Sequence, residues 1–204
     1  MRIDQCSLSR SELTAAARVA SRAFFDDPFF TFLMPDDRKR EKSLTIFFRS
    51  VLAHPGPQGR LVTVRSEHDE ILGVAAWLTT DGYPLSVRVQ LAQLPNSLRA
   101  FARQPKGLAD GNSYVQAIAK AHPKEPHWYL MLLCADPMIQ RRGVGTLLLE
   151  EAFTHVDTEG VASHLETQKE ENLAYYRRFG YELRATLRPV ASGPPIYTMW
   201  RAPR

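Results

Sequence analysis

The chain has very little cysteine and no long apolar segment. Its two cysteines, Cys6 and Cys134, fit neither a metal-ligand spacing nor a disulfide framework. Cys134 lies in an apolar run, where a buried reduced thiol is expected, and this fits a reducing, cytoplasmic compartment. The longest apolar run, residues 128–135, is far shorter than the ~20 residues of a membrane helix, and residues 1–5 lack the apolar stretch of a signal peptide. We therefore exclude a disulfide miniprotein and expect no membrane partner.

A large excess of charge of one sign is also missing. The 26 Lys+Arg and 22 Asp+Glu leave a formal net charge of +4, which divides into +1 over residues 1–80, +3 over 81–127 and zero over 128–204. The tight basic clusters at 38–40, 141–142 and 177–178 have acidic residues close by. A nucleic-acid surface needs a basic stripe interleaved with exposed aromatic residues, so no nucleic-acid partner is expected. Any anion site in this chain should be local.

What the sequence does have is the composition of an ordinary globular domain. Hydrophobic residues make up 44% and charged residues 24% of its 204 residues. A chain of this length can bury most of its apolar surface in one core, so we expect a single domain over residues 1–204. Internal repeats and low-complexity segments are absent from the sequence.

Local patterns predict a mixed α/β order. Ser9 and Glu12 have the spacing of a capping box at a helix start, and the turn at 26–28 ends that helix before the apolar patch 29–34. The breakers of residues 81–124, which include Pro95, Pro105 and Gly107, predict several short helices over one face. Residues 128–135 should form a central strand buried on both faces. The other predicted elements are a short strand at 2–5, a helix at 37–53 closed by residues 54–57, a hairpin of strands at 60–66 and 71–79, a helix at 143–157, a strand at 163–167, a helix at 172–179, and strands at 181–187 and 196–202.

The most informative motif is Gln140-Arg141-Arg142-Gly143-Val144-Gly145, between the central strand and the helix that follows. The first N–H groups of a helix have no intrahelical partner, and the helix dipole adds positive potential there. Glycines without a Cβ would let a diphosphate approach the backbone. A dinucleotide fingerprint would need glycine where Leu148 stands, and no Gly-Lys-Ser/Thr triplet of a Walker A loop is present. A glycine-softened turn without a ligand is the competing interpretation.

The pattern Gln/Arg-x-x-Gly-x-Gly/Ala after a central strand resembles the acetyl-CoA motif of the GNAT acetyltransferase superfamily, and residues 140–145 match it in full. Residues 172–181, Asn-Leu-Ala-Tyr-Tyr-Arg-Arg-Phe-Gly-Tyr, resemble the second motif of that superfamily. The resemblance implies a mixed twisted sheet of six to seven strands, splayed at the acetyl-CoA site and flanked by helices. Residues 128–202 would then carry most of the cofactor site, and residues 1–127 the core and the substrate side.

A narrower resemblance concerns the puromycin N-acetyltransferase branch, which acetylates amines of small molecules. It is carried by His122-Pro-Lys-Glu-Pro-His-Trp-Tyr-Leu130 and by Leu165-Glu166-Thr167. It implies direct acetyl transfer from acetyl-CoA, as co-substrate and without a metal, to a primary amine of an antibiotic-like or amino-acid-derived molecule. Acetylation of a protein lysine or N-terminus, and a non-catalytic acyl-CoA sensor, are the alternatives. A monomer and a homodimer both fit.

The superfamily resemblance also implies roles for individual residues. Asn172 would touch the cofactor, although an ordinary helix N-cap is the rival interpretation. Tyr176 matches the tyrosine that protonates the departing coenzyme A sulfur; Tyr175 is its neighbour and rival. The implied cofactor contacts are Leu133, Cys134, Ala135, Gln140, Arg141, Arg142, Gly143, Val144, Gly145, Thr146, Asn172 and Tyr176.

Glu166 is the candidate base, because a glutamate on a central strand needs a cleft or a cation beside it. An ion pair with an arginine is the structural alternative. Glu125, His127 and His164 are further candidates for the base, but no partner for these histidines is evident in the sequence. The candidate substrate-side residues are Phe29, Phe30, Trp77 and Tyr197.

Overall fold

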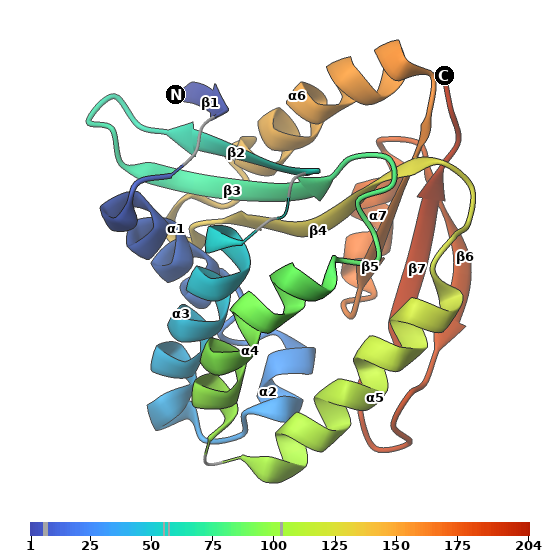
Figure 1. The fold of residues 1–204 in the computed structure, drawn as a ribbon. Helices are drawn as coiled ribbons and strands as arrows, with labels where there is room; N and C mark the ends of the chain where they lie inside the picture. Colours follow the sequence, from blue (N-terminus) through green and yellow to red (C-terminus); the bar gives the residue numbers. More distant parts are fainter. Residues whose placement is uncertain (6–7, 55, 57, 103) are drawn as a thin grey trace.

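Seven strands form one mixed sheet in the order β1-β2-β3-β4-β5-β7-β6, shown in Figure 1. The computed structural model describes residues 1–5, 8–54, 56, 58–102 and 104–204, so the prediction for Cys6 and the part of the 54–57 turn at Pro55 and Pro57 lie outside the described residues. Neighbouring strands are antiparallel except β4 and β5, which are parallel. The strands are β1 (Arg2–Gln5), β2 (Gly59–Arg65), β3 (Ile71–Leu78), β4 (His127–Ala135), β5 (Ala162–Thr167), β6 (Tyr181–Leu187) and β7 (Ile196–Arg201).

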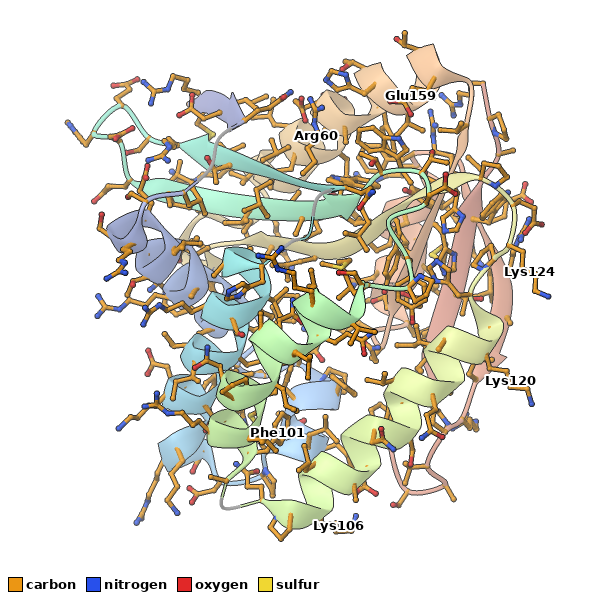
Figure 2. All side chains as sticks on the ribbon, viewed as in Figure 1. Arg60, Phe101, Lys106, Lys120, Lys124 and Glu159 are labelled. Carbon is orange, nitrogen blue, oxygen red and sulfur yellow. The ribbon has the colours of Figure 1, made fainter. Side chains whose placement is uncertain are left out.

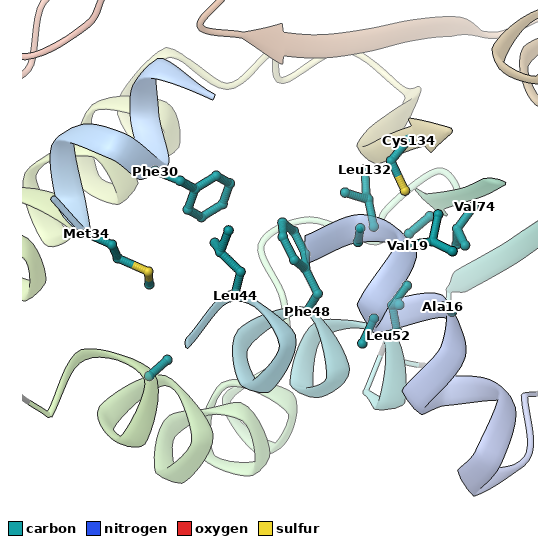
Figure 3. Packing of buried hydrophobic residues seen from close by; sticks show 14 of the residues in the cluster. Ala16, Val19, Phe30, Met34, Leu44, Phe48, Leu52, Val74, Leu132 and Cys134 are labelled. Atoms are coloured by element: carbon teal, nitrogen blue, oxygen red, sulfur yellow. The ribbon is translucent and has the colours of Figure 1, made fainter. Parts of the chain in front are cut away.

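Helices cover both faces of the sheet and divide its core in two. On one face, α1 packs against β3 and β4 and is backed by α3 (Figure 1). Figure 3 shows Phe30 of α2 and Leu44 and Phe48 of α3 in the same buried cluster as Val74 of β3 and Leu132 of β4. On the other face, α6 lies across β2, β3 and β4, and α7 lies against β6. The helices are α1 (Arg10–Ala23), α2 (Pro28–Leu33), α3 (Asp37–Ala53), α4 (Val87–Phe101), α5 (Pro105–Ala121), α6 (Val144–Glu159) and α7 (Glu171–Arg177), with a short 3₁₀ turn at Pro137–Ile139.

The N-terminus of α1 confirms the predicted capping box. The Ser9 hydroxyl accepts the Glu12 N–H, and the Glu12 carboxylate accepts the Ser9 N–H. These bonds, followed by the contact with Arg65, lower the pKa of Glu12 to about 2. Arg65 is buried, and its guanidinium lies 2.6 Å from the Glu12 carboxylate, so the cap also ties α1 to β2.

The prediction of several short helices over residues 81–124 is wrong, because α4 and α5 have 15 and 17 residues. Pro105 starts α5 at its first turn, where a missing N–H leaves no bond unmade, and Pro95 is accommodated inside α4. Gly107 is needed for packing, since a Cβ there would collide with the Leu33 carbonyl of α2. The inner side of α5 carries the buried Tyr114, whose hydroxyl donates to the Pro194 carbonyl at 2.7 Å. Its outer side and the following loop carry the lysines labelled in Figure 2.

A β-bulge divides β4 into two halves. Ala76 of β3 pairs with Leu132, while the next residue, Trp77, pairs with Leu130, so Met131 is the extra residue. Leu130 consequently faces the α6 side, whereas Leu132 and Cys134 face the α1 side. Regular alternation would have placed Leu130 and Leu132 on the same face.

The central pair of strands also diverges, as the predicted fold requires. β4 and β5 pair from His127 with Ala162 to Leu130 with Leu165, and in the described chain this ladder goes no further. The second half of β4 therefore has its free edge toward β5. No helix among the described residues has the length and apolar content needed to cross a membrane.

Candidate functional site

A groove with a cavity volume of about 780 Å³ opens where β4 diverges from β5. Its walls come from the end of β4, the loop before α6, the first turn of α6, and α7. The predicted cofactor residues that line it are Leu133, Cys134, Ala135, Gln140, Arg141, Gly143, Val144, Gly145, Thr146, Asn172 and Tyr176. Segments that are far apart in the sequence thus meet in one groove. Arg142 is exposed and does not line it.

The loop before α6 presents backbone to this groove. Gly143 caps α6 with a φ of 84°, and Arg141 also has a positive φ of 64°. A Cβ built on Gly143 would have nothing within 4 Å, so the space above the helix start is open. The free N–H groups of the first turn of α6 and the Arg141 side chain suit a diphosphate. The open space at the start of α6 is therefore compatible with an anionic group bound to this loop.

Helix α7 forms the opposite wall. Tyr176 is buried, and burial raises the pKa of its phenol, so it keeps its proton at neutral pH. Asn172 is not the N-cap of α7, because that position belongs to Glu170. Its side-chain amide instead donates to the Thr167 hydroxyl at 2.9 Å, which links α7 to the end of β5.

Six groove residues were not found from the sequence, namely Ala23, Phe24, Asp27, Lys169, Glu171 and Arg178, and Tyr175 was named only as the rival of Tyr176. Lys169 Nζ lies 3.8 Å from Asp27 Oδ2, so an ion pair joins the loop before α7 to the start of α2. Burial raises the pKa of Asp27. The Arg178 guanidinium lies 4.9 Å from the centre of the Tyr175 ring. The signals in the sequence for this wall were Tyr175 and the basic pair 177–178, all within the second motif.

Glu166 does not line the groove, and its side chain contacts a histidine instead. Its side chain is 5% exposed, and its carboxylate lies 2.8 Å from Nε2 of His164, which is 1% exposed. The expected structural alternative was an arginine, but the partner is this imidazole. The structure gives these histidines partners that the sequence did not reveal: His127 lies 3.0 Å from His122, and one ligand atom each from His122, His164 and Glu166 fall within 4.8 Å of one another. We name His122, His127, His164 and Glu166 the histidine–glutamate cluster.

The four candidate substrate-side residues are dispersed. Phe29 is half-buried, with its ring 4.9 Å from the Tyr114 ring. Phe30 is buried in the core between the helices and β3–β4. Trp77 is fully buried against Trp128 on the α6 side, which makes it a core residue and corrects the prediction of a pocket wall. Tyr197 is half-buried on β7, opposite Thr167 of β5.

The family model of the Acetyltransferase (GNAT) family matches residues 20–181 of this chain. The match covers most of the sequence and includes both the loop before α6 and α7. The chain therefore belongs to the GNAT family, and it is an acetyl-CoA-dependent N-acetyltransferase of that family.

Solved structures share the fold at low sequence identity. A histone acetyltransferase HPA2 and related acetyltransferase from Corynebacterium glutamicum is 23% identical, with a TM-score of 0.73, over 100% of this chain and 98% of the other. The PaiA N-acetyltransferase of Thermoplasma acidophilum, in complex with coenzyme A, is 11% identical with a TM-score of 0.58 over 99% of both chains. Arylalkylamine N-acetyltransferase 2 of Aedes aegypti is 11% identical with a TM-score of 0.59 over 99% of both chains. These likenesses confirm the predicted fold class.

Proposed function

We propose that this chain, as a single domain over residues 1–204, transfers acetyl directly from acetyl-CoA to a primary amine of a small molecule. The observation that carries the proposal is the position of Glu166, which is the first residue of β5 beyond its last pair with β4. A carboxylate therefore lies next to the point where β4 and β5 separate, and the groove with Tyr176 opens between the same strands.

The groove residues have separate roles in this proposal. The N–H groups of 141–146 hold the diphosphate, and the free edge of β4 at 133–135 pairs with the pantetheine arm as an added strand would. Asn172 contacts the cofactor from α7. Arg142, which is exposed outside the groove, adds only long-range positive potential. When bound, acetyl-CoA supplies an acetyl thioester, an acyl group that an amine can accept without an acyl-enzyme.

Two side chains move the protons. An alkylammonium has a pKa near 10 and must lose a proton before its nitrogen can attack, and Glu166 accepts that proton directly or through water. Tyr176 keeps its phenolic proton because burial raises its pKa, and it donates to the departing sulfur. Cys134 lines the groove, but burial raises the pKa of its thiol to about 12, so the thiolate that a nucleophile requires is disfavoured.

A small acceptor is favoured over a protein chain because helices enclose the acceptor side. The Tyr114 hydroxyl holds α5 to the segment before β7, and Phe29 packs against the same ring. The sequence resemblance to the puromycin N-acetyltransferase branch supports the same class of substrate. We propose a metal-free reaction in the cytoplasm by a monomer or homodimer.

Isothermal titration and thiol release test this proposal together. We expect acetyl-CoA to bind with 1:1 stoichiometry, and free thiol to appear with at least one amine from a panel that includes puromycin, arylalkylamines and short peptides. Absence of acetyl-CoA binding at millimolar concentration would refute the proposal. Thiol release with peptides alone would move the acceptor to proteins.

A further inference from the structure

The histidine–glutamate cluster joins three elements on the acceptor side of the sheet. His122 follows the last turn of α5, His127 starts β4, and His164 and Glu166 alternate with Leu165 on β5. His164 and Glu166 are almost completely buried. His122 is half-buried, so solvent reaches the cluster from its side. None of these four residues lines the cofactor groove.

Backbone carbonyls fix the protonation of His127 and then of His122. A carbonyl only accepts, so Nδ1 of His127 must carry the proton donated to the Glu125 carbonyl at 2.6 Å. Burial lowers the pKa of both His127 and His122, that of His122 to about 3, so both rings are neutral. The bare Nε2 of His127 therefore accepts the proton on Nε2 of His122 across 3.0 Å. Nδ1 of His122 is left as a buried lone pair, without a hydrogen-bond partner in the described part of the chain.

The same reasoning applies to His164. Its Nδ1 must donate to the Met199 carbonyl at 2.9 Å. Its Nε2 and the Glu166 carboxylate, 2.8 Å apart, then need one shared proton, because two bare acceptors would repel each other. The pair formed by His164 and Glu166 with this proton is neutral overall. The Tyr129 side chain is a second hydrogen-bond partner of Glu166, and a carboxylate, with about four lone-pair sites, can still accept a further donor.

Convergent acceptors in a buried site require a ligand that brings several hydrogens. We propose that the histidine–glutamate cluster is the acceptor-binding site and takes an unhindered primary alkylammonium group. Its N–H bonds are received by the bare nitrogen of His122 and by the pair of His164 and Glu166. This inference rests on the proposed function and deepens it, since it names the group that the acceptor must carry.

Aromatic rings surround the cluster in a way that suits a cation. Tyr83 stacks on His122 with ring centres 3.9 Å apart, and Tyr129 stacks on His164 at 5.7 Å. Trp200 lies 5.5 Å from His127, and the Arg184 guanidinium already lies over its ring, 3.9 Å from the ring centre. Aromatic faces attract ammonium groups and exclude water from them. The charged neighbours, Arg184 and Glu125, pair with each other at 3.5 Å.

The contact between His164 and Glu166 favours an ammonium over a divalent metal ion. A metal ion needs both atoms as bare ligands, held apart around it, whereas these atoms are joined by a proton at hydrogen-bond distance. An ammonium can add its own hydrogens without removing that proton. Metal binding at the same atoms is therefore the rival outcome of the test.

The protons balance in the proposed step. The ammonium gives one proton to the pair of Glu166 and His164, and its freed electron pair forms the C–N bond to the acetyl carbon. The C–S bond breaks with its electrons on sulfur. Tyr176 protonates this sulfur and regains a proton from the acylated nitrogen. The overall change is RNH₃⁺ and acetyl-CoA to RNHCOCH₃, coenzyme A thiol and one released proton.

Thiol release with butylamine, which carries little beyond the proposed group, tests the site. His122→Phe keeps the stacking on Tyr83 but removes both nitrogens, whereas His122→Gln offers one donor and one acceptor. We expect His122→Phe to raise KM for butylamine at least tenfold and to leave the Kd of acetyl-CoA unchanged. His122→Gln should recover a large part of the loss. His68→Phe, on the exposed turn between β2 and β3, is the matched control.

The outcomes separate the two proposals. If the wild-type chain does not bind acetyl-CoA, the proposed function itself is refuted. If the wild-type chain binds acetyl-CoA, then failure to acetylate butylamine, or an unchanged KM in His122→Phe, would overturn the acceptor site alone. Stoichiometric binding of ZnCl₂ that requires His122, with activity lost in EDTA, would assign the cluster to a metal ion. Side-chain ¹⁵N shifts that place a proton on Nδ1 of His122 would also contradict the inference.

Discussion

The Tyr175 hydroxyl occupies the space in which a side chain of Gly145 would begin. A Cβ on Gly145 would lie 2.7 Å from Tyr175 Oη and 3.6 Å from Tyr175 Cζ. Gly145 is the last glycine of the motif at 140–145, and Tyr175 belongs to the second motif. The two motifs are therefore in contact, and the requirement for glycine comes at least partly from the neighbouring helix.

This contact predicts a rescue. Gly145→Ala should push Tyr175 out of the groove wall and weaken acetyl-CoA binding about tenfold. Tyr175→Phe removes the atom nearest to the new methyl group, so the double variant should bind acetyl-CoA more tightly than Gly145→Ala. Titration calorimetry on the three variants measures this coupling. Additive losses would show that the two residues act separately.

Substitution by alanine should affect acetyl-CoA binding at Gly143 but not at Gly160. Both have positive φ, 84° and 63°, and a Cβ would meet nothing within 4 Å at either position. Alanine should thus cost about 1 kcal/mol of stability at each from backbone strain alone. Only Gly143→Ala should also weaken acetyl-CoA binding, because Gly160 caps the far end of α6. Urea unfolding measures the loss of stability, and calorimetry measures the affinity for acetyl-CoA. Equal affinities of Gly143→Ala and Gly160→Ala for acetyl-CoA would contradict a role of the Gly143 backbone in binding.

Tyr176→Phe should lower kcat by about a hundredfold or more, with little change in the Kd of acetyl-CoA. Tyr175→Phe is the matched control on the adjacent residue and should change kcat far less. Single-turnover acetylation of the best amine gives the rate of the chemical step. An unchanged rate in Tyr176→Phe would remove Tyr176 from the role of proton donor.

Glu166→Gln keeps the size of the side chain but removes its charge. We expect kcat/KM at pH 7 to fall about a hundredfold or more, because the acceptor must then lose its proton to water. The difference in kcat/KM between the wild-type chain and Glu166→Gln should shrink as the pH approaches the pKa of the amine, because more of the amine is then already unprotonated in solution. Glu125→Gln, at an exposed position, is the control. A deficit of constant size across the pH range would count against Glu166 as the base.

His122 should make the protein sensitive to acid. Burial lowers its pKa to about 3 from an ordinary 6.5, so between these values the unfolded chain binds a proton that the folded chain does not. The free energy of unfolding from this residue therefore falls as the pH drops below about 6.5. His122→Gln lacks this contribution, and its stability should fall less between pH 6.5 and 4.5. Urea unfolding at both pH values measures this difference. An equal loss of stability in the wild-type chain and in His122→Gln would contradict a neutral, buried His122 ring.

Most of the fold was accessible from local sequence patterns, because hydrophobic period and capping are local properties. The capping box at Ser9 and the strand at 181–187 are confirmed. The long helices α4 and α5 were missed because Pro95 and Gly107 were interpreted as breakers. Gly107 is set by contact with Leu33, a residue far away in sequence, so no local rule reveals it.

That most of the residues at 133–146 would line one groove was predictable for a related reason. Their motif is a continuous segment whose function depends on backbone and on one helix start. The histidine–glutamate cluster is assembled by the pairing of β4 with β5 and by the docking of α5, which a single sequence does not display. The core position of Trp77 likewise depends on which face of β3 meets α6.

The bulge at Met131 has a consequence for how the two sites can vary. Before it, the side chains of His127 and Tyr129 lie in or against the histidine–glutamate cluster; after it, Leu133 and Ala135 line the groove. One strand thus carries two independent side-chain registers. Changes in the first half can alter acceptor choice without shifting the phase of the second. Because Met131 is the extra residue, its deletion would remove the bulge and leave Leu130 on the α6 side and Leu132 and Cys134 on the α1 side, so the two halves would keep their side-chain faces and lose only the local distortion between them.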